Sequence, residues 1–317
     1  MFLLVFIGCA PVQVKLGLKV SLPKTPIQAI SVAQVSGAGI GPGQKSQLVV
    51  SITEPNGKVL QTQGVLHGKV LWSDLNLSAS VVTTSAKGKI ALPRDPRVSD
   101  GKVPHVTVTV PSHPELRADL DIPIRYDEKY TANFSGSTGM SGFNGTDGVD
   151  GTSGSMGSTD PNNPSPGGNG TDGTNGSDGQ DGNRGGDAPP VQVRVALRSG
   201  SHPLLQVGVS AGGKQKFYLV DPQGGSLTVR ADGGAGGSGG RGGRGGRGGS
   251  GGIGTPNGSS GRDGTDGRNG SDGPAGDGGK ITVTYDPLVK PYFKTIHLSS
   301  TNGPAPVFKE EAVAPLW

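Results

Sequence analysis

The chain has 317 residues with 59 glycines, one cysteine and 4% aromatic residues. A formal net charge of +4 is a mild imbalance, which speaks against a nucleic-acid-binding protein, and a lone cysteine excludes an internal disulfide. Because 41 of the glycines lie within 136–187 and 233–279, we expect folded β modules interrupted by glycine-rich inserts rather than one disordered chain.

The N-terminus, "MFLLVFIGCAPVQVK", is an apolar run that ends in Gly8 and the only cysteine, Cys9. It resembles a bacterial lipoprotein signal, in which a small residue precedes a cysteine that becomes diacylated. The resemblance implies removal of residues 1–8, lipidation of Cys9, and a membrane anchor at the bacterial cell envelope, on the outer membrane surface. Phe6 and Ile7 depart from the pattern, and the run is short and lacks a basic residue. A start codon annotated too late would account for the missing length and charge, and the alternative is a short apolar segment with a buried cysteine.

The module expected over residues 9–130 shows strand after strand from Val14 to Tyr130. Runs such as "SQLVVSITEPNGKVLQTQ" and "VTVTVP" alternate apolar and polar residues, and Pro55-Asn56-Gly57 supplies a turn. No stretch has a helical period. The layout resembles the immunoglobulin-like modules of bacterial surface proteins, so we expect an immunoglobulin-like β-sandwich.

The first glycine stretch, within 131–187, places glycine at every third residue from Gly136 to Gly157. The segment "STDPNNPSP" breaks the period, which then continues in a shifted phase to Gly186. Two arms around a proline-containing break predict a hairpin.

A second β module follows in 188–232 and 280–317, with apolar residues alternating from Val191 to Leu197. The second glycine stretch, 233–279, interrupts this module with two 22-residue arms around "TPN". We expect Leu227–Arg230 and Ile281–Tyr285 to pair antiparallel at its root. Each arm would project roughly 68 Å, at about 3.1 Å per residue.

A three-residue glycine period fits two structures. A collagen triple helix fits poorly, because the arms carry little proline and shift phase. The alternative is a bundle of single extended helices that satisfy their backbone groups on each other. This resembles the polyglycine-II bundles of springtail antifreeze proteins and of certain phage tail-fibre adhesins. Since 233–254 has two glycines per turn, we expect it at the centre of the bundle; flexible linkers are the competing interpretation.

Charged residues in the arms recur at the same period. Arg241, Arg244 and Arg247 should form one column, with successive arginines about 9.3 Å apart. We expect this column to face an acidic column, formed either by Asp263, Asp266 and Asp272 or by Asp172, Asp178 and Asp181. The recurring aspartates also suggest a calcium-binding repeat, but the nonapeptide period of such repeats is absent, so no metal and no cofactor is predicted.

Catalytic signals are weak. Ser210 lies in a G-x-S-x-G pattern, but a strand-like run follows where that motif needs a helix, and the five histidines are scattered. The sequence therefore predicts no enzyme. It favours a surface-anchored structural or adhesive lipoprotein that contacts an extracellular protein or glycan. The alternative is an ice-binding or glycan-binding module that uses flat Ser/Thr columns, namely Thr152, Ser155, Ser158, Thr171, Thr174 and Ser177.

Overall fold

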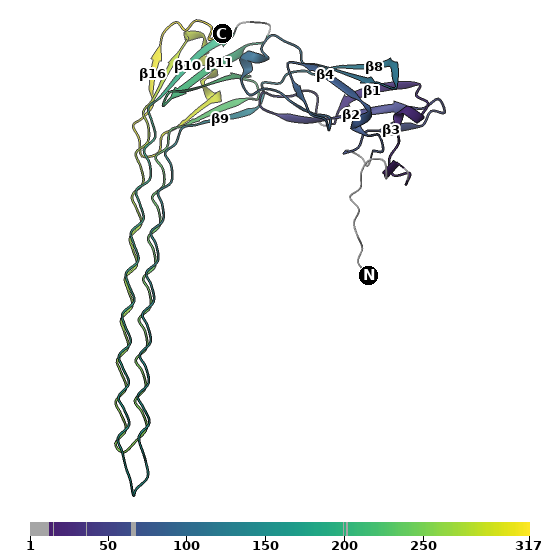
Figure 1. Ribbon diagram of the computed structural model, residues 1–317. Helices are drawn as coiled ribbons and strands as arrows, with labels where there is room; N and C mark the ends of the chain where they lie inside the picture. The colour runs from purple at the N-terminus through teal and green to yellow at the C-terminus, as the bar shows by residue number, and fades with distance from the viewer. Residues whose placement is uncertain (1–12, 15, 36, 65–67, 199, 201) are drawn as a thin grey trace.

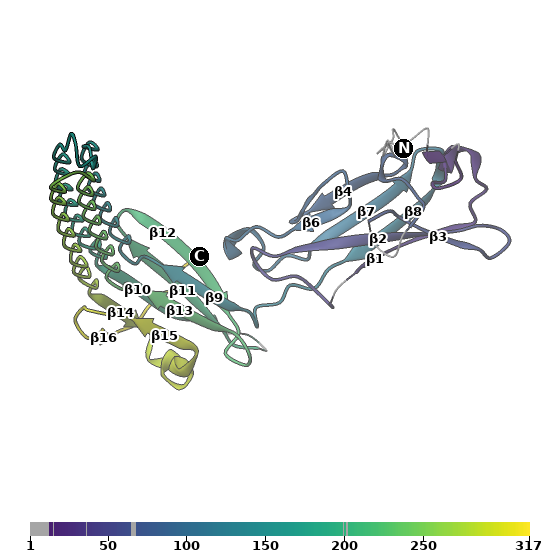
Figure 2. The ribbon, with the colours of Figure 1, turned by 90° about the horizontal axis from the view of Figure 1, so that it is seen from below.

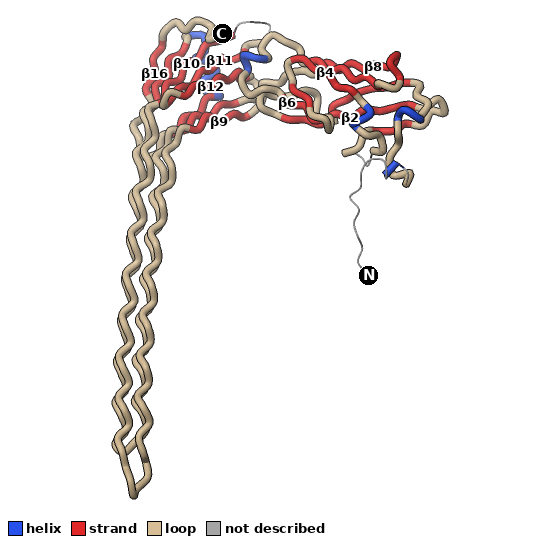
Figure 3. The backbone as a smooth tube through the Cα atoms, viewed as in Figure 1, coloured by secondary structure: helices blue, strands red, loops and turns tan. Residues whose placement is uncertain are grey.

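The computed structural model describes residues 13–14, 16–35, 37–64, 68–198, 200 and 202–317. Strands make up most of its regular structure and the helical segments are short, so the prediction of an all-β chain is confirmed. Two β modules lie next to each other, and a long bundle of glycine-rich arms leaves the second module in one direction (Figures 1 and 3). The molecule is therefore L-shaped.

The N-terminal module has two antiparallel sheets. The first has the order β1-β2-β6-β5, with β3 paired to β2, and consists of β1 (Ala29–Gln34), β2 (Lys45–Thr53), β3 (Val59–Gln61), β5 (Thr83–Thr84) and β6 (Lys89–Ala91). The second has the order β4-β7-β8, from β4 (Asn76–Ser80), β7 (His105–Val110) and β8 (His113–Asp121). The 3-10 helix η1 (Leu22–Lys24) precedes β1, and the connections between strands include η2 (Trp72–Asp74) and η3 (Pro96–Val98).

Strand periodicity builds the core of this module. Alternate residues of β2 and β7, among them Leu48, Val50, Val106 and Val108, meet in one buried cluster shared by both sheets. The predicted turn lies between β2 and β3, where the Gly57 N–H donates to the Glu54 carbonyl at 2.9 Å. Gly57 has a φ of +82°, which favours glycine at this position.

The second module also has two sheets (Figure 2). The larger has the order β12-β11-β10-β14-β16, from β10 (Val191–Arg198), β11 (Leu204–Ala211), β12 (Lys214–Val220), β14 (Ile281–Tyr285) and β16 (Val307–Glu310). The smaller has the order β15-β13-β9, from β9 (Lys129–Asn133), β13 (Ser226–Arg230) and β15 (Ile296–Ser299). Val191, Val193 and Val195 lie in a buried cluster with Leu227 and Val229 of the facing sheet.

Two features of this module differ from the prediction. β9 pairs with β13, so the segment around 129–130 belongs to the second module rather than to the N-terminal module. A 3-10 helix, η4 (Pro287–Thr295), occupies part of the segment expected to hold only strands and a tail. Pro287 opens this helix, and the Asp286 side chain caps it by accepting the Leu288 N–H. A 3-10 helix has about three residues per turn, so its sequence does not show the period of an α-helix.

The expected antiparallel pairing of β13 with β14 is wrong. β13 pairs in parallel with β9 and β15, whereas β14 pairs in parallel with β10 and β16. The reason is that each glycine hairpin starts in one sheet and returns to the other. Its two arms therefore face each other across the module, and the neighbours within a sheet come from different hairpins.

The two modules contact each other through side chains at η3 and the C-terminus. The Trp317 indole N–H donates to the Asp100 carboxylate at 2.9 Å, and Arg198 forms an ion pair with the same carboxylate at 3.0 Å. The Arg97 guanidinium lies 3.8 Å from the centre of the Phe217 ring. These contacts join the N-terminal module to the larger sheet of the second module.

Candidate functional site: the glycine bundle

The bundle consists of four extended arms, which we number arm 1 (136–157), arm 2 (167–186), arm 3 (233–254) and arm 4 (258–279). Backbone hydrogen bonds at every third residue join arm 1 to arms 2 and 3, arm 4 to arms 2 and 3, and arm 2 to arm 3. No such bond joins arm 1 to arm 4 in the described chain. In cross-section the arms therefore form a rhombus, with arms 2 and 3 across its short diagonal.

The parallel pairs of the bundle continue the sheets of the second module. The β9–β13 pair runs on into arms 1 and 3, where the Gly136 N–H donates to the Asp232 carbonyl at 2.9 Å. The β10–β14 pair runs on into arms 2 and 4 in the same way, with the Ala188 N–H donating to Asp277 at 2.9 Å. The core of the module thus sets the register of all four arms at the root.

Each repeat glycine faces a neighbouring backbone. A Cβ added to Gly145 of arm 1 would lie 2.0 Å from the Ser177 carbonyl oxygen, and one added to Gly267 of arm 4 would lie 2.0 Å from the same atom. At such distances the neighbouring backbones would have to move apart. Glycine is therefore required because the arms hold each other through their backbones.

The expectation that 233–254 is central is incomplete, because arm 2 also has three neighbours. Bonds that repeat every three residues leave three side-chain columns per arm. Arm 3 directs two glycine columns at its flanking neighbours, since Gly242 faces arm 4 and Gly243 faces arm 1. Arm 2 directs its one glycine column, which includes Gly176, at arm 3. Glycine content per turn thus reports the direction of the columns rather than the number of neighbours.

Aspartate and asparagine side chains bind the backbone of the adjoining arm. Asp147 Oδ1 accepts the Arg244 N–H at 2.8 Å, Asp178 Oδ1 accepts the Arg268 N–H at 2.6 Å, and Asn269 Oδ1 accepts the Gly242 N–H at 2.9 Å. The same contact recurs along three of the arms, through Asn144, Asp150, Asn169, Asp172, Asn175, Asp181, Asp263, Asp266 and Asp272. These side chains satisfy donors that no backbone carbonyl reaches.

This role was not predicted from the sequence, although the sequence carries a signal for it. Asp and Asn alternate within single columns, as in Asn144, Asp147 and Asp150. The two residues share an acceptor oxygen at the same reach but differ in charge. Their interchange therefore indicates a position that needs an acceptor and not a charge.

The predicted arginine column exists, but its expected ion pairs do not. Arg241, Arg244 and Arg247 use their backbone N–H groups to bind Asn144, Asp147 and Asp150 of arm 1. Within the described residues none of the three guanidinium groups forms an ion pair. Asp263, Asp266 and Asp272 of arm 4 do lie against arm 3, yet they accept the N–H groups of Gly248, Gly245 and Gly239. One oxygen of each of these carboxylates accepts a backbone N–H, and the three arginines are exposed on the outside of the bundle.

One outer face of the bundle, shared by arms 1 and 2, carries no charged side chain; we call it the neutral face. Hydroxyl groups meet across it, with Thr146 and Ser177 at 3.0 Å and Thr152 and Thr171 at 3.1 Å. The face consists of Ser137, Met140, Phe143, Thr146, Val149, Thr152, Ser155, Ser158, Ser165, Thr171, Thr174, Ser177, Gln180 and Asn183. Both Ser/Thr columns noted in the sequence lie here, beside Met140, Phe143 and Val149, which are 69–71% exposed.

The root of the bundle is organised by Asp232, which is 6% exposed. Its carboxylate accepts hydrogen bonds from the Ser299 hydroxyl at 2.6 Å, the Thr301 N–H at 2.8 Å and the Arg230 side chain at 2.9 Å. Burial alone would raise the pKa of this carboxyl, but the donors from Ser299, Thr301 and Arg230 outweigh it and hold the pKa well below its usual range. Asp232 therefore fixes arm 3 to the chain that follows β15.

The remaining sequence candidates do not assemble into a site. Ser210 lies in β11, and the strand β12 follows it as predicted. His105 binds Asp121 at 2.7 Å and Asp119 at 3.0 Å across β7 and β8, and these two carboxylates raise its pKa. No group of three or more His, Cys, Asp or Glu side chains in the described ranges is arranged to hold a metal ion. Cys9 lies outside the described residues.

Comparison with known proteins adds no family. No protein-family model and no curated protein matches the sequence. In the part of the chain that the structure describes, no helix is long and apolar enough to cross a bilayer.

Proposed function

We propose that the protein is a surface-anchored structural or adhesive lipoprotein that presents the glycine bundle as a rigid projection. The observation that carries this proposal is the closed pairing of the four arms, in which the repeat glycines face neighbouring backbones and the other side chains lie on the outside or bind an adjoining arm. On this proposal the bundle is of the polyglycine-II type and the N-terminal module is immunoglobulin-like.

Rigidity follows from the number of bonds in each repeat. In the turn around Gly243, arm 3 donates one N–H to a carbonyl of arm 2 and two to side chains of arms 4 and 1. An isolated extended helix has no internal hydrogen bonds and would bend freely. With about 68 Å of length per arm, such a bundle holds its tip far from the β modules.

The anchor is proposed to be a lipid on Cys9, with the mature protein on the outer surface of a bacterial envelope. Its test is metabolic labelling of the native cell with palmitate, compared with a Cys9→Ala variant. Label in the wild type and none in the variant is expected. An unlabelled protein with an intact Met1 in the native cell would contradict the anchor.

The adhesive role is proposed to use the neutral face, because contact there removes no charge from water. The experiment measures attachment of cells that display Phe143→Asp, which places a charge on this face, against a matched Ser238→Asp variant on arm 3. Loss of attachment in the first variant only is expected. Equal attachment of both variants to the wild-type level would remove the neutral face from the role.

The neutral face also supports a second candidate, ice binding, since its hydroxyl columns are flat and free of charge. A thermal-hysteresis measurement on the wild type and on Thr146→Asp tests this function. Hysteresis that Thr146→Asp abolishes would favour ice over a protein or glycan partner.

A further inference from the structure

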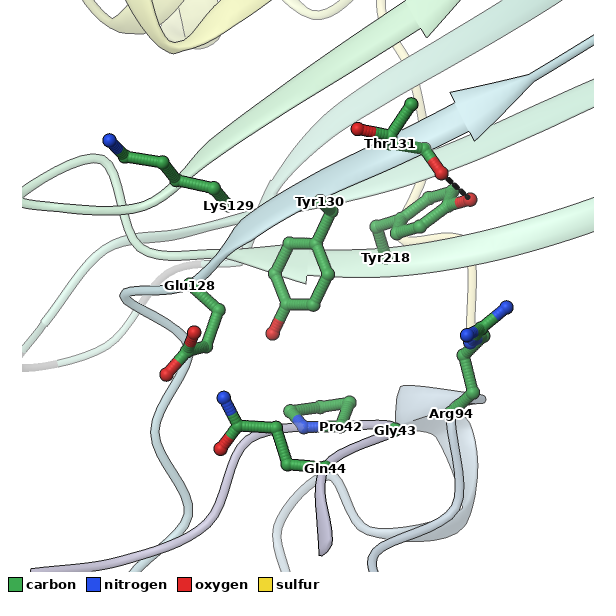
Figure 4. Close-up of a pocket in the computed structure, with 9 residues that line it drawn as sticks. All are labelled: Pro42, Gly43, Gln44, Arg94, Glu128, Lys129, Tyr130, Thr131 and Tyr218. Atoms are coloured by element: carbon green, nitrogen blue, oxygen red, sulfur yellow. Dashed lines mark hydrogen bonds between the residues drawn. The ribbon is translucent and has the colours of Figure 1, made fainter. Parts of the chain in front are cut away.

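A cavity of about 360 Å³ lies at the junction of the two β modules. Figure 4 shows its lining, in which Pro42, Gln44 and Arg94 come from the N-terminal module and Glu128, Tyr130 and Tyr218 from the end of the connection and the second module. Its volume is at the lower end of the range for small-ligand sites, about 300–1,000 Å³.

Tyr130 places an unpaired hydroxyl at this cavity. Its ring leaves β9 toward Pro42, Gln44 and Glu128 (Figure 4), and the hydroxyl oxygen is buried with no hydrogen-bond partner in the described chain. Burial raises the pKa of Tyr130, so the hydroxyl keeps its proton and is both a donor and an acceptor. Buried polar groups in proteins are normally paired, so this hydroxyl has capacity for an outside partner.

Three other side chains bring unused polar groups to the same lining. Gln44 uses its oxygen to accept the Gly41 N–H at 3.0 Å, and its amide NH2 has no partner among the residues that the structure describes. Glu128 uses Oε1 to bind Arg125, and within the described part of the chain Oε2 has no partner. The Arg94 guanidinium has no ion-pair partner among the described residues.

The chemistry of these groups selects one class of ligand. The lining combines donors and acceptors with aromatic surface, since the Tyr130 and Tyr218 rings lie 5.8 Å apart. An apolar ligand would leave the hydroxyl, amide and carboxylate unpaired. An anion would meet Glu128 and a cation would meet Arg94, and the side chain of Lys129, which also belongs to the lining, extends away from these groups (Figure 4). A neutral molecule therefore suits Glu128 and Arg94 best.

We propose that this inter-module cavity binds a neutral sugar, one monosaccharide ring at a time. Sugar hydroxyls both donate and accept hydrogen bonds, which matches the Tyr130 hydroxyl, the Gln44 amide and Glu128 Oε2. The apolar face of the ring suits the tyrosine and proline surfaces. The bundle takes no part in this site, so the proposal stands apart from the role assigned to the arms.

The test uses the full chain and a panel of free sugars: glucose, galactose, mannose, fucose, N-acetylglucosamine and N-acetylgalactosamine. Binding is followed by saturation-transfer NMR and titration calorimetry in wild type, in Tyr130→Phe, and in Tyr292→Phe as a matched control away from the cavity. We expect one of these sugars to bind. Tyr130→Phe should weaken it about five- to ten-fold, the effect of one neutral hydrogen bond, while the control keeps wild-type affinity.

Thermal unfolding separates a binding defect from a folding defect. Because the Tyr130 hydroxyl has no partner in the chain, Tyr130→Phe should be as stable as the wild type or more so. The proposal is overturned if no sugar of the panel binds at millimolar concentration, or if Tyr130→Phe binds as well as the wild type. Competition from acetate or phosphate at the same residues would also overturn it, since the ligand would then be charged.

Discussion

Substitution of Gly243 by alanine tests the backbone cohesion of the bundle most directly. The added Cβ would lie 2.0 Å from the Thr146 carbonyl oxygen and 2.9 Å from the Asp147 nitrogen, both backbone atoms of arm 1. Arm 1 must then move away from arm 3. Three bonds cross at this turn: Gly145 N–H to Arg241, Gly148 N–H to Arg244, and Arg244 N–H to Asp147 Oδ1. At about 1 kcal/mol each, their loss destabilises the local structure by about 3 kcal/mol.

Amide hydrogen exchange measures this loss locally, without requiring the whole chain to unfold in one step. We expect protection at Gly145 and Gly148 to fall by about 100-fold, since 1.4 kcal/mol is a factor of ten. Arg244→Ala, in the same turn, is the matched control, because its side chain points outward and forms no ion pair with the described residues. It should change stability by less than about 0.5 kcal/mol. Equal protection in the two variants would refute the argument that glycine allows the arms to approach.

Three further predictions concern single carboxylates and a histidine. Asp147→Asn should leave hydrogen exchange of the Arg244 N–H unchanged, because asparagine keeps the acceptor oxygen. Asp147→Ala removes this oxygen and should weaken the contact by about 1 kcal/mol. Equally faster exchange in both variants would show that the charge of Asp147 is needed. The pKa of Asp232 is lowered in the folded chain. Its contribution to the free energy of unfolding is therefore complete above the ordinary aspartate pKa of about 3.9 and declines as the pH falls below that value. Asp232→Asn should therefore lower the free energy of unfolding by about 3 kcal/mol at neutral pH, and urea unfolding near pH 2 should show a smaller difference. The pKa of His105 is raised in the folded chain, so its contribution to the free energy of unfolding is complete below about pH 6.5 and is lost as the pH rises through the pKa of the folded state. An NMR titration should show that Asp121→Asn lowers the pKa of His105. An unchanged pKa would mean that the contact with Asp121 does not contribute to the shift.

The sequence predicted the elements whose cause is local. Alternation in β2, β7 and β10 located buried faces correctly, since a strand repeats every two residues. The three-residue glycine period and its breaks located the four arms. The turn at Pro55-Asn56-Gly57 followed from the backbone preferences of those residues.

What the sequence did not predict depends on partners distant in the chain. The separation of β13 and β14 into different sheets could not be derived from hairpin symmetry, because β9 and β15 occupy both edges of β13, and β10 and β16 occupy both edges of β14. The same holds for Asp147, whose partner Arg244 lies 97 residues away. Opposite charges at matching spacing suggested ion pairs. The backbone N–H groups of the arms occupy those carboxylates instead, which no rule based on net charge anticipates.

The constant register of the bundle makes its length adjustable. Arm 1 side chains bind arm 3 at a separation of 97 residues at one position after another, and arm 2 side chains bind arm 4 at a separation of 90. Removing one three-residue unit from each of the four arms at the same level would preserve every remaining contact and shorten the projection by about 9.3 Å. Loss of a unit from one arm alone would shift every contact beyond it. The length of the bundle can therefore change in steps of one three-residue unit per arm without a change in either β module.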